Sequence, residues 1–407
     1  MDYEFLSQEG IPDYIRSRPE LAGVVDPDAI VSITEVGDGN LNLVFIIEDS
    51  AGKSVVLKQA LPYVRLVGPE WPMTPLRAAK EAHALMTHSA LVPELVPVTH
   101  FYDQDRYVIG MENLQGFRVW RGALMEGLKN EGVAADMGTY VAHVTFGTSV
   151  LAVEAEHHKE LMAQSINPEL CKITEDLVFT EPHDDIGRNS VLPENEKDAA
   201  EHASDPAMIA AMGQAKWIFM TRAEALIHGD LHTGSVMVKA SSGDEGAGES
   251  RAFDSEFAFY GPVAFDLGAL WANYAISAAR WFALGDDDMA RWSLGLIEQT
   301  WESFEATFRQ LYPKRLDSRV WKDELLEELL LQWREESWLF AAAKMSRRIV
   351  GLAKTADIES LEPHHREGAA RGVLNLARRA VRQRTEDSRP EKFVELAQST
   401  LLEFRTE

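Results

Sequence analysis

The sequence predicts an α+β chain of two lobes, a small antiparallel β-rich lobe at the N-terminus and a larger, mostly helical lobe after it. Short apolar runs separated by glycine-containing turns fill residues 31–58, whereas helical spacing with few breakers dominates the second half of the chain. At 407 residues the chain is long enough for two lobes around one cleft. We place the N-terminal lobe at 1–113 and the C-terminal lobe at 114–407.

In the N-terminal lobe we expect an antiparallel meander of strands. Apolar residues alternate over 31–36, resume over 41–47 after a glycine-containing turn, and recur at 55–57. A helix is expected over 76–86, and a further strand over 107–111.

The C-terminal lobe is expected to be helical over 134–164, over 206–226 and from residue 265 to the end. Two strand-like pieces, 236–239 and 251–253, bracket a Gly- and Ser-rich stretch, which predicts a hairpin with a flexible tip. We interpret the acidic, polar segment between Asp184 and Asp205 as a mobile loop or a partly ordered flap.

Composition limits the possible functions and partners. The formal net charge of −25 argues against non-specific binding to nucleic acid and against docking on anionic membranes. The single cysteine, Cys171, excludes an intramolecular disulfide and a cysteine-rich zinc site. The first residues have neither the basic nor the apolar region of a signal peptide, and no apolar run is long enough to span a bilayer. We therefore expect a soluble, cytoplasmic protein.

The turn Gly37-Asp38-Gly39-Asn40 is the first candidate functional motif. Glycines permit a tight turn and let backbone N–H groups approach phosphate oxygens. A dinucleotide-binding fingerprint is excluded, because a strand and not a helix follows these glycines. A phosphate-binding loop and a plain hairpin turn both remain open, since Asn42 stands where a third glycine would complete the usual phosphate loop.

Lys58 follows this turn by about twenty residues and ends the last strand of the meander. A lone lysine at a strand end is usually a surface residue. Here, however, the order is glycine turn, strand, lysine and then a helix that carries Glu81. Glu81 could pair with Lys58 and hold its ammonium group near the phosphates of a nucleotide.

The strongest signal is the string His228-Gly-Asp230-Leu-His232-Thr-Gly-Ser235, followed about twenty residues later by Asp254-Ser-Glu256. Phosphoryl transfer needs one carboxylate for the substrate hydroxyl and separate carboxylates for Mg²⁺. Asp230 suits the first role. Asp254 and Glu256 suit the second, because on a strand they would point to the same face.

The string from His228 to Ser235 allows two other interpretations. His228, Asp230 and His232 at alternating positions could bind Zn²⁺ or Fe²⁺ in a hydrolase, although such a site would need further histidines at compatible places. The string could also be a turn made of capping residues. The carboxylate arrangement favours phosphoryl transfer over both.

The two segments His228–Ser235 and Asp254–Pro262 resemble the catalytic and metal-binding segments of the methylthioribose kinases, in the aminoglycoside-phosphotransferase branch of the protein-kinase-like fold. Gly37–Asn42, Leu57–Arg65 and Met345–Gly351 resemble other signatures of that family, in the family's order. The resemblance implies transfer of the γ-phosphate of ATP to the 1-hydroxyl group of 5-methylthioribose, with Mg²⁺ as cofactor, in methionine salvage. It also implies a homodimer.

The resemblance further implies a role for each matching residue. Asp230 would be the catalytic base, while Asp254 and Glu256 would hold Mg²⁺. The residues implied to bind ATP are Gly37, Gly39, Asn40 and Lys58 at the phosphates, and Glu112, Asn113 and Leu114 at the adenine. Arg347, Arg348 and Trp71 would lie at the substrate.

Ser235 departs from kinases in general, which place a metal-binding Asn at this position. It matches the methylthioribose branch, where Ser235 would contribute to the metal site. Asp266 is expected to cap the following helix or to brace the metal-binding loop rather than to touch metal.

Three alternative functions remain at this point. The first is a kinase of a related sugar such as 5-deoxyribose, and the second is an aminoglycoside or choline-type phosphotransferase. The third is a nucleotide-binding pseudokinase, against which the joint presence of Lys58, Asp230, Asp254 and Glu256 argues.

Overall fold

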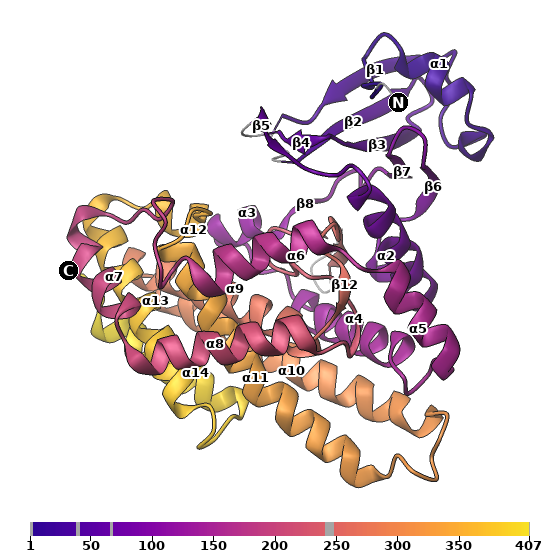
Figure 1. Ribbon diagram of the computed structural model, residues 1–407. Coiled ribbons are helices and arrows are strands. Elements are labelled where there is room, and N and C mark those ends of the chain that lie inside the picture. The colour runs from indigo at the N-terminus through magenta and orange to yellow at the C-terminus, as the bar shows by residue number, and fades with distance from the viewer. Residues whose placement is uncertain (1–2, 38–40, 66–67, 241–247, 407) are drawn as a thin grey trace.

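The computed structural model describes residues 3–37, 41–65, 68–240 and 248–406. Gly37 therefore lies among the described residues, whereas Gly39 and Asn40 lie outside them, as does most of the expected hairpin tip. Figure 1 shows a β-rich lobe above a larger helical lobe, so the predicted α+β class is confirmed.

The N-terminal lobe contains a five-stranded antiparallel sheet in the order β1-β2-β3-β7-β6. Its strands are β1 (Ile30–Glu35), β2 (Asn42–Asp49), β3 (Ser54–Ala60), β6 (Thr99–Asp103) and β7 (Val108–Glu112). A separate two-stranded ribbon consists of β4 (Tyr63–Val64) and β5 (Gly68–Pro72). The meander and the strand predicted over 107–111 are confirmed.

Side-chain alternation along β3 gives the sheet two different faces. Val55 and Leu57 pack with the N-terminal segment, which contains α1 (Ile11–Arg16) and the 3₁₀ turn η1 (Pro19–Leu21). Lys58 lies on the opposite face, paired across the sheet with Val44 and Ile109. Strand β3 continues to Ala60, so Lys58 lies within the strand and not at its end as expected, and its side chain is directed into the molecule.

Helix α2 (Arg77–Leu91) covers the face of the sheet that carries Lys58. Ala78, Glu81, Ala82 and Leu85 are buried on one side of α2, and their spacing matches the helical period. Glu81 therefore lies on the buried stripe of the helix. The helix predicted over 76–86 is confirmed and extends further.

The C-terminal lobe is mainly helical. Its α-helices are α3 (Trp120–Met125), α4 (Val133–Thr148), α5 (Ala155–Gln164), α6 (Pro168–Thr174), α7 (Glu196–Ala203), α8 (Pro206–Thr221), α9 (Val263–Leu284), α10 (Asp287–Leu311), α11 (Asp323–Ile349), α12 (Ala356–Glu359), α13 (Pro363–Gln383) and α14 (Pro390–Glu403). Shorter helical turns are η2 (Pro93–Leu95), η3 (Glu175–Thr180), η4 (Pro193–Asn195) and η5 (Tyr312–Lys314).

Short strands of this lobe hold the loops of greatest interest. They are β8 (Arg118–Val119), β9 (Ala225–Ile227), β10 (Val236–Lys239), β11 (Glu249–Ala252) and β12 (Phe259–Gly261). Strand β10 pairs with β11 and with β8, and β9 pairs with β12. The expected hairpin of 236–239 with 251–253 is present, with its second strand at 249–252.

Two predicted helices are shorter than expected. The helix predicted over 134–164 is divided into α4 and α5, because Ser149 adopts an extended conformation and the chain turns to bury Leu151. The helix predicted over 206–226 ends at Thr221, because Ala225–Ile227 pairs with β12 instead. In both cases tertiary packing overrides local periodicity.

The acidic segment 184–205 is more ordered than a mobile loop. Its second half forms η4 and α7, and α7 packs on α13. Arg371 pairs with Asp198 at 3.0 Å, and Arg378 and Arg382 pair with Asp205 at 2.9 and 2.6 Å. These ion pairs hold the segment against the helical lobe.

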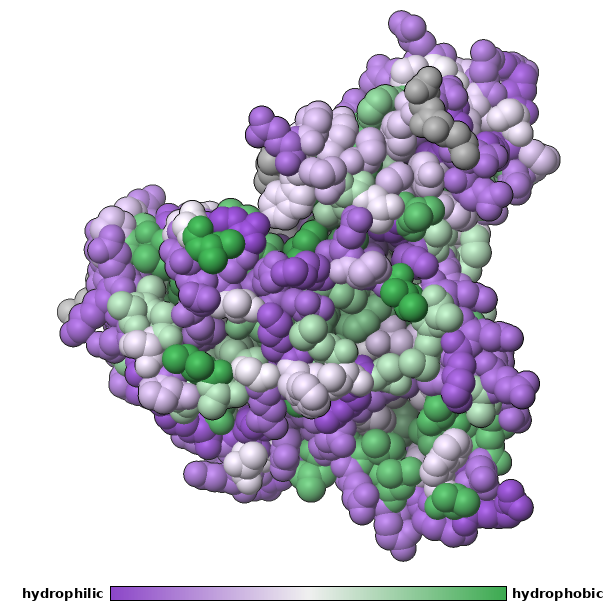
Figure 2. All heavy atoms as spheres, in the orientation of Figure 1, coloured by the Kyte–Doolittle hydropathy of each residue, from purple (hydrophilic) through white to green (hydrophobic). Residues whose placement is uncertain are grey.

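One hydrophobic core extends through both lobes. It includes Ile109 and Met111 of the sheet, Ala82 and Leu85 of α2, and the packed faces of α4, α9, α10, α11 and α13. The face drawn in Figure 2 is mainly hydrophilic, with small separate hydrophobic groups, and it is hollowed where the lobes meet. Among the described residues, no helix combines the length and apolar character needed to cross a membrane.

Candidate active site

Two loops of the helical lobe meet because of how their strands pair. The 228–235 loop joins β9 to β10, and the 253–258 loop joins β11 to β12. Since β9 pairs with β12 and β10 pairs with β11, both loops leave the same small group of strands. This topology brings Asp230 toward Asp254 and Glu256.

The ring of His228 joins the two loops. Its Nδ1 atom accepts a hydrogen bond from the backbone N–H of Asp230 at 3.3 Å, and its Nε2 atom donates to the carbonyl of Phe253 at 2.9 Å. Gly229 is required at the point of contact, because it has φ +81° and an added Cβ would lie 2.2 Å from the carbonyl oxygen of Phe257.

The prediction that Asp254 and Glu256 lie on one strand is wrong. Strand β11 ends at Ala252, and Asp254 adopts a left-handed conformation with φ 65°. The two carboxylates are brought together by the turn of the loop and not by strand alternation. A left-handed conformation at a non-glycine residue costs free energy and is common at functional sites.

Asp266 braces the 228–235 loop. It lies in the first turn of α9, and its carboxylate accepts hydrogen bonds from the backbone N–H groups of His228 at 2.8 Å and Gly229 at 3.0 Å. The sequence suggested a helix cap or a brace of the metal-binding loop, and the structure shows a brace of the other loop. Asp266 therefore fixes where the chain enters the Asp230 turn.

Asp230 accepts from two side chains, one on each carboxylate oxygen. The ammonium of Lys344 lies 2.8 Å from Oδ1, and Nε2 of His232 lies 3.3 Å from Oδ2. Burial alone would raise the pKa of this carboxyl, but Lys344, His232 and Arg347 together hold it well below its usual range. Asp230 is therefore a carboxylate at neutral pH.

The tautomer of His232 follows from its neighbours. The backbone N–H of Gly234 donates to Nδ1 at 2.9 Å, so the proton lies on Nε2 and points to Asp230. Burial lowers the pKa of His232 to about 3, which keeps the ring neutral. Arg121 lies 3.3 Å from the same Nδ1 and also donates to Asn273 at 3.1 Å.

Lys58 lies between acids from both lobes. Its ammonium donates to Glu81 at 2.7 Å, and it also forms a hydrogen-bonded ion pair with Asp254. Burial alone would lower the pKa of Lys58, but Asp254, Glu81 and Glu256 raise it above its usual value. The expected pairing of Lys58 with Glu81 is present in the structure.

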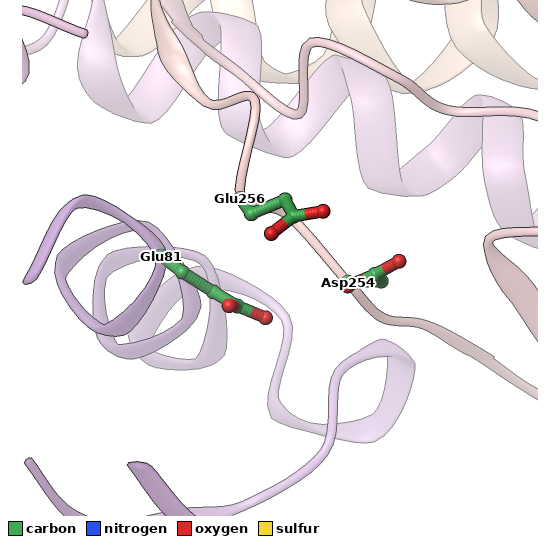
Figure 3. A group of neighbouring side chains, drawn as sticks. All are labelled: Glu81, Asp254 and Glu256. Atoms are coloured by element: carbon green, nitrogen blue, oxygen red, sulfur yellow. The ribbon is translucent and has the colours of Figure 1, made fainter. Parts of the chain in front are cut away.

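Glu81, Asp254 and Glu256 form a carboxylate cluster whose ligand atoms lie within 4.8 Å of one another. Figure 3 shows Glu81 projecting from α2 toward the loop that carries the other two. Burial, Asp254 and Glu81 raise the pKa of Glu256 to about 7, although Lys58 and Arg77 oppose this shift. An all-oxygen, acid-rich donor set fits Mg²⁺.

Two residues that support this cluster were not among the predicted site residues. Asn42 donates to Oε2 of Glu256 at 2.8 Å and accepts from Arg77 at 3.1 Å. Arg77, which is 1% exposed, also donates to the carbonyls of Leu41 at 2.6 Å and Leu61 at 2.7 Å. Arg77 thus ties the start of β2, the end of β3 and the acid cluster together.

Arg347 and Arg348 lie near the end of α11, on the side of the cleft that holds Asp230. Both interact with the charge of Asp230, and burial lowers the pKa of each guanidinium. Arg348 donates long hydrogen bonds to the carbonyls of Ala353 at 3.4 Å and Lys354 at 3.3 Å. Nε of Arg347 is buried without a hydrogen-bond partner among the described residues.

Ser235 and the 112–114 segment are two further parts of the predicted site. The Ser235 hydroxyl donates to the carbonyl of Asp230 at 2.9 Å. In the 112–114 segment, the backbone N–H of Glu112 donates to Val98 at 2.8 Å, and the side-chain amide of Asn113 donates to Ser54 at 3.1 Å. The carbonyls of Asn113 and Leu114 accept hydrogen bonds from the backbone N–H groups of Gln115 at 2.8 Å and Phe117 at 3.0 Å.

Trp71 lies in β5 and lines a cleft of about 470 Å³ together with residues of α6 and η3. The guanidinium of Arg188 stacks over its ring at 5.6 Å. The following loop crosses to the other lobe, where the backbone N–H of Thr74 donates to Glu169 at 2.6 Å.

The alternative metal site of His228, Asp230 and His232 is not formed. Both ring nitrogens of His228 and Nδ1 of His232 are engaged by backbone groups. Across the described ranges, the acid cluster is the one group of His, Cys, Asp and Glu side chains close enough to hold a metal ion.

Comparison with known proteins gives a consistent result. Residues 32–307 match the model of the phosphotransferase enzyme family. The methylthioribose kinase of Geobacillus kaustophilus is 37% identical over 87% of this chain and 89% of its own length. The methylthioribose kinase of Bacillus cereus is 36% identical over 93% of this chain and 94% of its own.

Among solved structures, a glucosamine kinase in complex with glucosamine, ADP and inorganic phosphate is 15% identical. The match covers 94% of this chain and 89% of that chain, with a TM-score of 0.49.

Asp266→Asn should loosen the 228–235 loop. The amide has one oxygen to accept from two N–H groups, and its own NH₂ would face one of them, which costs about 1–3 kcal/mol. We expect a lower Tm and faster hydrogen–deuterium exchange at His228 and Gly229. Asp286→Asn is the control, because Asp286 caps α10 and Asn is an equally good cap. Unchanged hydrogen–deuterium exchange in Asp266→Asn would contradict the role of Asp266 as a brace of the 228–235 loop.

Mg²⁺ binding to the nucleotide-free protein should release protons near neutral pH. With a pKa of about 7, Glu256 is roughly half protonated at pH 7, and a metal ligand must be deprotonated. Calorimetry in buffers of different ionisation enthalpy should report release of roughly half a proton at pH 7 and almost none at pH 9. Glu256→Gln should abolish this release, whereas the exposed Glu328→Gln should not. Equal proton release at both pH values would contradict the assignment of Glu256 as the group that loses the proton.

Proposed function

The chain belongs to the methylthioribose kinases of the phosphotransferase enzyme family, and we propose that it transfers the γ-phosphoryl group of ATP to the 1-hydroxyl group of 5-methylthioribose. The products are ADP and methylthioribose 1-phosphate, an intermediate of methionine salvage. The observation that carries the proposal is the pairing of an ionised Asp230 with a separate acid cluster formed by α2 and the adjoining loop.

Asp230 is proposed to receive the substrate. Lys344 and His232 each occupy one lone-pair direction of the carboxylate, which leaves other directions to accept the 1-hydroxyl proton. As the new O–P bond forms and the bond to ADP breaks, the hydroxyl proton moves to Asp230 and then to solvent. Positioned base assistance of this kind contributes roughly 10² to 10⁴ in rate.

The residues proposed to hold ATP and Mg²⁺ come from both lobes. Asp254 and Glu256 would hold Mg²⁺, with Ser235 beside them, and Lys58 would contact the phosphates. When bound, Mg²⁺ neutralises charge that develops on the phosphates. The glycine turn at Gly37, Gly39 and Asn40 would lie over the phosphates, and the Glu112–Leu114 segment would contact adenine.

The substrate side of the cleft carries positive charge. Arg347 and Arg348 join Lys344 and Arg121 around Asp230, and this group disfavours a cationic aminoglycoside or choline as substrate. The same cations suit a phosphoryl group in transfer. Trp71 is proposed to cover the sugar, and a homodimer in the cytoplasm is proposed on the family resemblance.

A substrate panel tests the function. ADP release with Mg·ATP should be fast with 5-methylthioribose and slow with ribose, choline and kanamycin. Loss of the thiomethyl group alone is worth about 1–3 kcal/mol, so 5-deoxyribose should be used less efficiently but measurably. Turnover restricted to a cationic substrate would overturn the proposal. ATP binding without turnover of any of these compounds would favour a pseudokinase.

Asp230→Ala should abolish turnover while ADP binding stays within a few-fold of wild type. The carboxylate is proposed to act on the sugar hydroxyl and not on the nucleotide, and its loss should lower kcat by at least roughly 10². Turnover and Kd for ADP should be measured on the same preparation. Activity near wild type would remove Asp230 from this role.

A further inference from the structure

Lys344 is a buried lysine in the middle of the site, although no sequence motif drew attention to it. It lies on α11, and its side chain is 4% exposed. Its ammonium donates to Oδ1 of Asp230 at 2.8 Å and lies 4.4 Å from the centre of the Phe265 ring. A lysine buried at a helix–helix contact is costly unless a carboxylate compensates it.

The geometry around Asp230 indicates how the ion pair with Lys344 affects the carboxylate. Lys344 occupies Oδ1 and His232 faces Oδ2, so the carboxylate is held from both sides and cannot rotate freely. Lys344 comes from α11, whereas His232 comes from the same loop as Asp230. The orientation of the Asp230 carboxylate is therefore fixed by the helical lobe as well as by its own loop.

The charges that face Lys344 come from three elements. Asp230 belongs to the 228–235 loop, Arg347 and Arg348 lie one turn further along α11, and Asp266 lies on α9 beside Phe265. Burial and the two arginines lower the pKa of Lys344 and Asp230 partly restores it, with the net result that the pKa is about 8. Lys344 is thus a cation at neutral pH that titrates within a measurable range.

We propose, on the basis of the proposed function, that Lys344 is a positioning residue of the reaction, which orients the Asp230 carboxylate toward the sugar hydroxyl from α11. It acts through Asp230 and not as the base itself. The ammonium has three protons and one carboxylate partner among the described side chains, so it can keep the pair intact while the sugar binds.

The first test compares Lys344→Met with Lys216→Met. Lys216 is a half-buried lysine of α8 that donates to Thr180 at 2.8 Å, far along the chain from the site, so it controls for the loss of a partly buried lysine. Lys344→Met should lower kcat about 100-fold with KM for ATP nearly unchanged. Lys216→Met should retain kcat within threefold. Equal behaviour of the two variants would overturn the proposal.

The pH profile separates positioning from a merely structural role. Removing Lys344 removes a cation that lowers the pKa of Asp230, so the acid limb of kcat/KM should move to higher pH in Lys344→Met. The wild-type alkaline limb near pH 8 should disappear in Lys344→Arg, because arginine stays charged. A wild-type profile in both variants would contradict the proposal.

Chemical rescue and a substrate-free measurement complete the test. Methylammonium should restore part of the activity of Lys344→Ala, and should not affect Asp230→Ala. NMR of ¹⁵N-labelled lysine should show the Lys344 amine titrating near pH 8, and at lower pH in Asp230→Asn, which lacks the carboxylate that raises this pKa. This titration needs no sugar, so it tests the pair even if the substrate panel fails. A Lys344 pKa that is unchanged in Asp230→Asn would overturn the proposal.

Discussion

The ion pair of Lys58 with Glu81 and Asp254 is the interaction on which the arrangement of the two lobes depends. Lys58 from the sheet and Glu81 from α2 are buried, and they meet Asp254 of the helical lobe, whose side chain is 43% exposed. The charges of Lys58 and Glu81 would each be costly to bury alone, so each is tolerated only while its partner is in place. Arg77 and Asn42 extend the same network to the start of β2 and to Glu256. The cleft is therefore defined by electrostatics across the lobes as much as by the continuous apolar core.

Much of the fold and of the candidate site could be predicted from the sequence, because the relevant signals are local or follow one another along the chain. Strand alternation predicted the sheet, and the order of turn, lysine and helix predicted that Glu81 would meet Lys58. The residue types of the 228–235 string, with two acids at fixed spacing beyond it, predicted that the two acidic segments share one site. The pairing of β9 with β12 and of β10 with β11 explains why that spacing works.

The other parts depend on tertiary contacts that leave no local pattern. Arg77 begins an ordinary helix, and Lys344 lies in a helical segment rich in alanine, so neither spacing nor composition distinguishes them. Asp254 was expected on a strand, but its left-handed backbone is imposed by the loop that closes on His228. The helices predicted over 134–164 and 206–226 were too long because burial of Leu151 and pairing of β9 decide where they end.

The cationic end of α11 has a consequence for what the enzyme releases. The sugar substrate of the enzyme is uncharged, whereas the phosphorylated product is a dianion. The product therefore lies near the cations Lys344, Arg347 and Arg348 of α11. Coulombic attraction in a poorly solvated cleft then favours the phosphorylated sugar over the free one. This charge distribution therefore slows release of the product and not binding of the substrate. Flux through the enzyme is accordingly expected to depend on a downstream reaction that consumes the sugar phosphate.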